Sequence, residues 1–77
     1  GVVLNEHEFI DKNNKLYRAD RINIYQNNIS IIDYKTSQPE EKHKQQINAY
    51  AVALSDAGYQ VTEKLLAYIN SGEVINI

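Results

Sequence analysis

The 77-residue chain has no cysteine, so it carries neither a disulfide framework nor a thiolate metal site. Any metal site in it would have to use oxygen or imidazole ligands. The sequence also lacks a signal peptide and an apolar run long enough to span a bilayer, so we expect a cytoplasmic protein that makes no membrane contact. Its net charge of −2 lacks the basic excess of a stand-alone nucleic-acid binder. These absences point to a small globular domain, in which 43% of the residues are hydrophobic.

Methionine is absent as well, and the chain begins at Gly1. We therefore expect residues 1–77 to be a single domain that forms a piece of a longer protein. A domain of this size buries only about 60% of the surface of its unfolded chain, so its core is small.

The spacing of apolar residues predicts five strands and one helix in the order β-β-β-α-β-β. The expected class is α/β (α+β mixed), with a mixed sheet and one main helix. The expected strands cover residues 2–10, 15–25, 29–36, 61–69 and 74–77.

The predicted helix has recognisable signals at both ends. Ser37 and Glu40 have the spacing of a capping box, and Pro39 would lie in the first turn, where proline is tolerated. Gly58 suits the position that follows the last helical residue. Between them an apolar stripe recurs at helical spacing, formed by Ile47, Tyr50, Ala51 and Leu54.

The second and third strands are expected to form a hairpin around a turn at Asn27–Asn28. Strict alternation places the following residues of the second strand on one face: Leu16, Arg18, Asp20, Ile22 and Ile24. The expected register pairs Ile24 with Ile31, Ile22 with Asp33, and Asp20 with Lys35. Since opposed and diagonal side chains lie within about 4.5–8 Å of each other, three charged groups would cluster on an otherwise apolar face.

Such a cluster of Asp20, Asp33 and Lys35 has a specific chemical meaning. Two converging carboxylates repel each other and persist together only around a cation or a shared proton. Mg²⁺ prefers oxygen ligands and often takes further oxygens from water and a phosphate. A lysine on the same face can hold or deprotonate an attacking water, or neutralise charge on phosphoryl oxygens. The three residues therefore fit metal-assisted hydrolysis of a phosphodiester.

At these positions the chain resembles the PD-(D/E)XK nuclease superfamily. The resemblance rests on Asp20, on the run Asp33-Tyr34-Lys35 that follows isoleucines, and on Gln46 four residues before Tyr50. It is strongest to the RecB-like exonuclease branch, which forms the C-terminal nuclease domain of helicase-nucleases of the RecB and AddA type. The resemblance covers residues 17–54 and implies a restriction-endonuclease-like core.

The resemblance also implies a role for each matching residue. Asp20 and Asp33 would be metal carboxylates, and the backbone carbonyl of Tyr34 would add a ligand for Mg²⁺ or Mn²⁺. Lys35 would be the catalytic lysine, and Gln46 and Tyr50 would brace the site or contact the DNA. In the intact parent the domain would act in DNA repair and recombination as the exonuclease module of a helicase-nuclease.

The chain departs from the pattern of this branch at two points. A His or Glu on a helix upstream of the first strand has no counterpart here, and Arg18-Ala19 replaces a glycine that often precedes the first Asp. The first departure leaves two alternatives open: a non-catalytic DNA-binding or structural module of the same fold, and an interaction domain that caps a helicase. An exposed sheet face in place of the absent helix would favour a homodimer.

Several residues have a simpler interpretation beside the functional one. Asp33 and Lys35 could form a surface ion pair. We expect His7 and His43 to be surface residues, because their spacing is not that of a metal site. Glu6 and Glu8 stay open as further ligands from the first strand.

Overall fold

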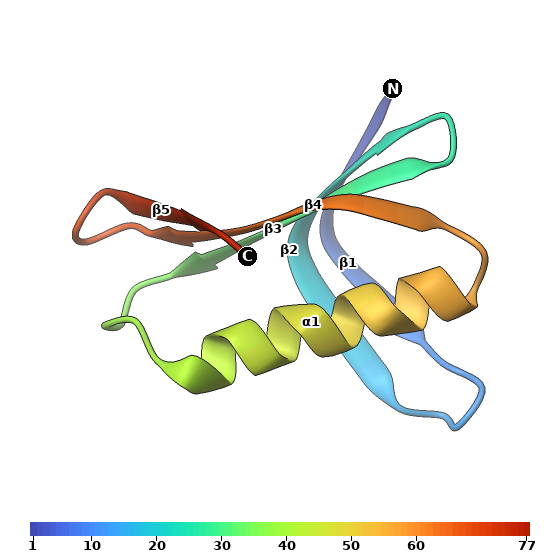
Figure 1. Ribbon diagram of the computed structural model, residues 1–77, viewed down its shortest axis with the longest axis horizontal. Coiled ribbons are helices and arrows are strands. Elements are labelled where there is room, and N and C mark those ends of the chain that lie inside the picture. The colour runs from blue at the N-terminus through green and yellow to red at the C-terminus, as the bar shows by residue number, and fades with distance from the viewer.

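A computed structural model describes residues 1–77 as one five-stranded sheet with a single helix packed on one face (Figure 1). The strands follow each other across the sheet in the order β1-β2-β3-β4-β5. All neighbouring strands are antiparallel except β3 and β4, which are parallel because α1 connects them as a crossover. The predicted order and mixed sheet are therefore confirmed. The elements are β1 (Val2–Ile10), β2 (Leu16–Tyr25), β3 (Asn28–Lys35), α1 (Glu41–Asp56), β4 (Gln60–Tyr68) and β5 (Glu73–Asn76).

Helix α1 begins later than the capping box predicts. Glu40 is the N-cap residue and is extended, with φ −139° and ψ 149°, and no side chain caps the helix. The Ser37 hydroxyl donates to the Gln38 carbonyl at 3.4 Å instead. Proline disfavours the helical conformation in the residue before it, so Pro39 keeps the preceding segment out of the helix. The predicted start at Ser37 is therefore wrong.

The end of α1 agrees with the sequence. Gly58 has φ +100° and follows the C-cap residue Ala57. Its N–H donates to the Ser55 carbonyl at 3.0 Å, and the Tyr59 N–H donates to the Leu54 carbonyl at 3.1 Å. These two bonds form a Schellman motif, in which glycine supplies the positive φ.

The β2–β3 hairpin has a different register from the predicted one. The turn residues are Gln26 and Asn27, with Gln26 at φ +56°, and Tyr25 pairs with Asn28. The register pairs Ile22 with Ile31 and Ile24 with Ile29. Each residue of β3 is therefore shifted by two positions. Because side chains alternate with a period of two, the shift keeps the isoleucines on one face.

The first half of β2 presents the opposite face to the one predicted. Ala19 and Ile22 are both buried although they are three residues apart, whereas Leu16 and Arg18 are exposed. The alternation therefore breaks between Ala19 and Ile22. The paired strand is bent at the same level, where Glu6 has φ +51°, and Figure 1 shows β1 and β2 curving beneath α1. Because of this bend, the beginning of β2 turns its other face toward α1, so that Ala19 is buried and Arg18 is exposed.

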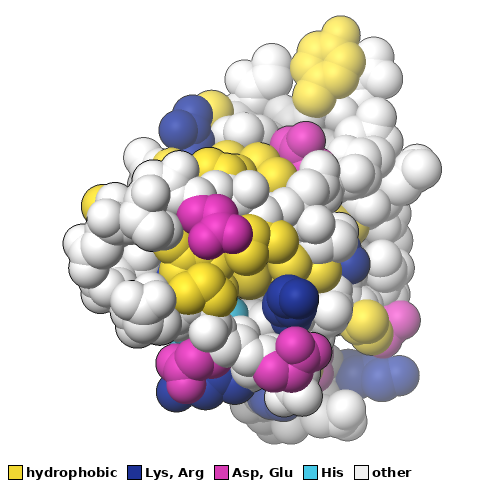
Figure 2. Space-filling view, turned by 60° about the vertical axis from the view of Figure 1, so that its left-hand side comes forward, with side chains coloured by type: hydrophobic (Ala, Val, Ile, Leu, Met, Phe, Trp, Pro, Cys, Tyr) yellow, Lys and Arg dark blue, Asp and Glu magenta, His cyan; other side chains and the backbone are white.

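The core lies between α1 and the sheet. The predicted stripe of the helix is buried there, and the largest fully buried side chains come from β2, β3, α1 and β4: Ile22, Ile29, Ile31, Ile47 and Leu66. No helix is long and apolar enough to cross a membrane. Figure 2 shows a face on which apolar side chains reach the surface with charged side chains around them. Exposed Ile69 and Val74 of the β4–β5 hairpin are among the large apolar residues at the surface of the molecule.

Candidate metal and nuclease site

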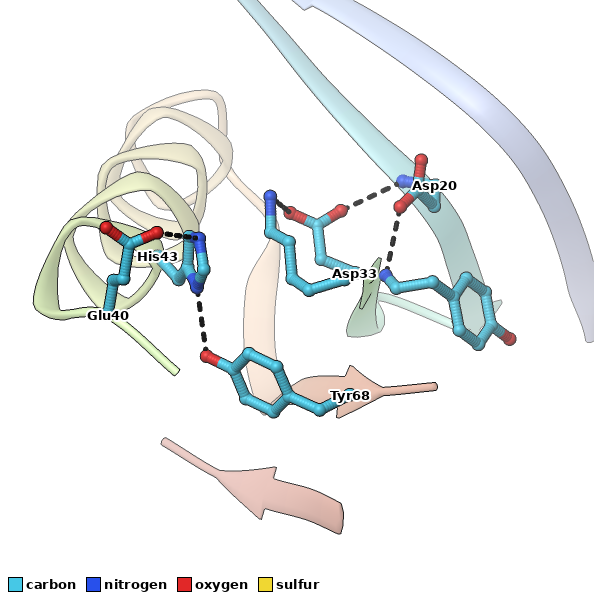
Figure 3. Close-up of polar contacts among 7 residues, drawn as sticks. Asp20, Asp33, Glu40, His43 and Tyr68 are labelled. Atoms are coloured by element: carbon cyan, nitrogen blue, oxygen red, sulfur yellow. Dashed lines mark hydrogen bonds and ion pairs between the residues drawn. The ribbon is translucent and has the colours of Figure 1, made fainter. Parts of the chain in front are cut away.

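The candidate site lies where the β2–β3 ladder stops. Regular pairing ends at Arg21 and Ile32, and beyond it the two aspartate side chains bond the backbone of the neighbouring strand (Figure 3). The Asp20 N–H donates to Asp33 Oδ1 at 3.1 Å, and the Tyr34 N–H donates to Asp20 Oδ2 at 2.9 Å. Each carboxylate thus accepts an N–H group that a backbone carbonyl would accept in a regular β-ladder. Their positions are fixed by backbone atoms, which limits the side-chain entropy that binding a ligand would cost.

Asp33 is the buried member of the pair, with 8% of its surface exposed. Burial raises the pKa of Asp33, and the nearby Asp20 charge raises it further. The Asp20 N–H, the Lys35 ammonium and Arg18 favour the charged form without reversing the shift. A carboxylate whose negative charge is disfavoured by its surroundings is stabilised by a cation. The interpretation of Asp33 and Lys35 as a surface ion pair is therefore wrong for Asp33.

Lys35 pairs with Asp33 rather than with Asp20. Its ammonium Nζ lies 4.0 Å from Asp33 Oδ2, and both side chains are largely shielded from solvent. The predicted cross-strand pair of Asp20 and Lys35 is wrong, because the register shift brings Asp20 opposite Asp33 instead. The three residues still meet at one end of the hairpin, with Asp33 in the middle.

A cleft of about 330 Å³ opens beside this end of the hairpin, between β2, β3 and α1. Four of the predicted site residues line it: Asp33, Lys35, Gln46 and Tyr50. Asp20 and Tyr34 are not among its lining residues, so Asp20 reaches the site through Asp33 and the strand backbone. Asp33 therefore lines a cleft although most of its surface is buried.

Tyr50 is a buried residue that lines this cleft. It is 2% exposed, and its ring makes edge contacts with Phe9 and Tyr17 at centroid distances of 6.4 and 6.1 Å. Its hydroxyl shares a hydrogen bond of 3.0 Å with His7 Nδ1. Burial, and to a smaller degree the Asp33 charge, raises the pKa of Tyr50 to about 12. Tyr50 therefore stays neutral, while Gln46 is exposed at the cleft.

The prediction that His43 is a surface residue is wrong. His43 is 4% exposed, its Nδ1 shares a hydrogen bond of 3.0 Å with the Tyr68 hydroxyl, and its Nε2 lies 3.5 Å from a Glu40 carboxylate oxygen (Figure 3). His43 precedes Ile47 by four residues and so extends the buried stripe of α1 by one turn. That spacing was the signal available in the sequence. His7 is also partly buried, through its bond to Tyr50.

The donor set fits a magnesium or manganese ion held by few protein ligands. No group of three or more His, Cys, Asp or Glu side chains is placed to hold a metal. Glu6 pairs with Arg18 at 3.6 Å on the surface and Glu8 is exposed, so neither completes the carboxylate pair. Mg²⁺ is commonly bound through one or two carboxylates, with water and substrate phosphate as its other ligands. Asp20 and Asp33 are the candidate carboxylates at this end of the hairpin.

Comparison with curated proteins finds no significant match to this chain. The sequence model of the PD-(D/E)XK nuclease superfamily matches residues 18–75, which include both aspartates, the lysine and the whole of α1. The five-stranded mixed sheet with one helix is compatible with the restriction-endonuclease-like core of that superfamily. The match covers most of the length of the chain, so this chain belongs to the PD-(D/E)XK nuclease superfamily.

Proposed function

We propose that the chain is a metal-dependent DNA nuclease that hydrolyses phosphodiester bonds. The observation that carries this proposal is the buried Asp33 beside Lys35, joined to Asp20 through the backbone and open to a cleft. In a member of a nuclease superfamily, this arrangement supports the interpretation of the three residues as a catalytic site.

Asp20 and Asp33 would hold Mg²⁺ or Mn²⁺, and the Tyr34 carbonyl is proposed as a further ligand. When bound, such an ion polarises a phosphoryl oxygen and lowers the pKa of a coordinated water. The Lys35 ammonium, held near Asp33, would orient the attacking water or neutralise charge on the phosphoryl oxygens. Gln46 would contact the strand, and Tyr50 would keep the floor of the cleft dry and rigid.

We further propose that the chain acts as the exonuclease module of a helicase-nuclease in DNA repair and recombination. The support for this finer assignment is the Gln46 and Tyr50 pair, which the RecB-like branch places on the helix after the catalytic lysine. Both residues line the same cleft as Asp33 and Lys35 here. The remainder of such a polypeptide or complex would be the second partner, beside DNA.

A cleavage assay on a labelled oligonucleotide with Mg²⁺ or Mn²⁺ tests the proposal. We expect Lys35→Met and Asp33→Ala to abolish cleavage, because each removes a charged group from the reacting centre. Lys12→Met is the matched control, since Lys12 is exposed in the β1–β2 turn and does not line the cleft. Circular dichroism should show that all three variants remain folded. Cleavage retained by either cleft variant would sink the proposal.

One observation favours a second candidate, a non-catalytic DNA-binding or structural module of the same fold. The carboxylate pair has no third acidic or histidine neighbour, so metal binding depends on two side chains and on the substrate. This candidate predicts an oligonucleotide that binds but is not cut at millimolar Mg²⁺ or Mn²⁺. The homodimer expected from the sequence also stays a prediction, and sedimentation velocity is its test.

A further inference from the structure

The charge of the candidate cleft is opposite in sign to that of the chain. Three of its lining residues are cationic, namely Lys15, Arg18 and Lys35, and only Asp33 is acidic. The chain as a whole has 8 Lys and Arg against 10 Asp and Glu, for a net charge of −2. Cations have therefore gathered at one concave surface of an acidic protein. Such a surface attracts an anion, because a cleft with walls of one sign concentrates its electric field.

Two of these cations have no strong structural partner. Lys15 makes no ion pair, and its ammonium lies 5.3 Å from the centre of the Tyr17 ring, a contact that positions it without neutralising it. Arg18 pairs with Glu6 at 3.6 Å, but the two side chains are 57% and 76% exposed. An ion pair this exposed contributes little to stability. Both cations are therefore available to a ligand at little cost in stability.

The position of Lys15 and Arg18 suggests a chain of anionic groups as the ligand. Lys15 directly precedes β2 and Arg18 lies near its start, and both line the same cleft as the Asp33–Lys35 pair. A cleft of about 330 Å³ is at the small end of ligand-binding sites, so it suits one strand rather than a duplex. Arginine matches a phosphate with two parallel donors, and lysine serves as a point charge.

We propose that Lys15 and Arg18 form a phosphate-binding ledge that holds a nucleic-acid strand while one of its phosphodiesters lies at Asp33 and Lys35. The inference rests on the proposed function, which is the reason for placing the reacting phosphodiester at Asp33 and Lys35. It goes beyond that function by assigning substrate binding to two residues outside the superfamily signature.

Binding of fluorescein-labelled (dT)12 in EDTA, measured by fluorescence anisotropy at several salt concentrations, tests the ledge without cleavage. We expect Lys15→Ala and Arg18→Ala each to weaken binding on the order of fivefold, and to reduce the salt slope by about 0.7 for each lost phosphate contact. Lys12→Ala is the matched control from the same turn, and it should bind as the unmodified chain does. Arg18→Lys should restore part of the loss, because it keeps the charge.

A gain of affinity gives an independent readout. Glu6→Gln removes the anion that competes for Arg18 while keeping the size of the side chain, so we expect tighter binding of the same oligonucleotide. A variant that merely unfolded could not produce this result. Unchanged affinity in Glu6→Gln together with unchanged binding in Lys15→Ala and Arg18→Ala overturns the inference.

The two proposals fail separately. If the unmodified chain cleaves DNA and the two ledge variants bind normally, the ledge proposal is wrong and the nuclease proposal stands. If the ledge variants bind more weakly but the unmodified chain cleaves no DNA, the ledge proposal is supported and the nuclease proposal is wrong. An unmodified chain that does not bind the oligonucleotide in EDTA overturns the ledge, whatever the cleavage assay shows.

Discussion

Asp11 and Asp33 both accept backbone N–H bonds, yet their pKa values move in opposite directions. In the β1–β2 turn, Asp11 Oδ1 accepts the N–H groups of Asn13 and Lys15 at 2.8 and 3.0 Å, and Oδ2 accepts the Tyr17 hydroxyl at 3.2 Å. The Lys15 N–H is the main cause of a lowered Asp11 pKa, against a weaker effect of desolvation. Asp11 therefore supports the turn in its charged form.

Asp33 at the open end of the β2–β3 hairpin is the contrasting case. It accepts one backbone N–H and lies at 4.0 Å from an ammonium group, but its burial outweighs both and raises its pKa. The difference shows that a backbone hydrogen bond does not by itself make a carboxylate structural. At Asp11 the protein stabilises the charge, whereas at Asp33 it places a charge where a bound cation would stabilise it.

The largest expected contrast between the two regions is in DNA cleavage. Asp33→Asn should lower the rate at least about 100-fold, because even the outer-shell partners of metal ligands contribute about 10–100-fold. Asp11→Asn should leave the rate within a factor of about two, since Asp11 does not line the cleft, asparagine keeps an oxygen acceptor for the Lys15 N–H, and salt screens the lost charge. Initial rates with Mg²⁺ measure both. Equal losses in the two variants would remove the distinction.

A smaller effect is expected on the stability of the open hairpin end. Asp20→Ala takes away the acceptor of the Tyr34 N–H and should cost about 1 kcal/mol of unfolding free energy. Asp20→Asn removes the same charge but keeps an oxygen at that place, so it should cost less. Urea unfolding gives the free energies, and amide hydrogen exchange should be faster at Tyr34 in the alanine variant alone. Faster exchange in both variants would show that charge, rather than the hydrogen bond, holds the strand end.

The pH dependence of stability should also separate the two aspartates. The pKa of Asp33 is higher in the folded chain than the ordinary 3.8, so the folded state binds the proton more tightly and stability falls as the pH rises through the raised pKa. Asp33→Asn keeps an acceptor for the Asp20 N–H and abolishes that loss. In EDTA its urea midpoint should therefore exceed that of the unmodified chain at pH 7, and the difference should vanish below pH 3.8.

Asp11 should give the opposite sign and the smallest effect. Its lowered pKa means that the charged form adds stability above pH 3.8, and that this stability is lost as the pH falls through the folded value. Asp11→Asn should thus be less stable than the unmodified chain at pH 7, with the difference shrinking in acid. Thermal unfolding at pH 7 and pH 3 measures it. A midpoint that is unchanged at neutral pH would show that the turn does not depend on this charge.

Local signals in the sequence predicted most of the fold. The strand and helix positions follow from the spacing of apolar residues, and the end of α1 follows from Gly58, because these depend on neighbours in the chain. The hairpin register could not be decided in this way. The predicted and observed registers differ by two residues, and both keep Ile29 and Ile31 on the core face.

The non-local features of the fold were the ones that alternation missed. The bend that buries Ala19 and exposes Arg18 arises from packing of the curved strands β1 and β2 against α1. No residue pattern within β2 predicts it. The error in the helix start has a local cause, because Pro39 was taken as a first-turn residue when it instead holds the chain extended.

The sequence supplied the residue types of the candidate site but not its geometry. Asp33, Lys35, Gln46 and Tyr50 line one cleft, and their roles stay a prediction. The sequence could not show that Asp20 would bond the Tyr34 N–H beside this cleft, because that contact exists only in the shifted register.

The most direct test of the account is a titration of the ¹⁵N-labelled chain with Mn²⁺, followed by NMR. Paramagnetic broadening should begin at the amides of Asp20, Asp33, Tyr34 and Lys35, should be reversed by excess Mg²⁺, and should be lost in Asp33→Asn. Broadening should leave Asp11 and its turn unaffected at the same concentration. No localised broadening at millimolar Mn²⁺, or broadening centred on Asp11, would contradict the claim that the open end of the β2–β3 hairpin is a metal site.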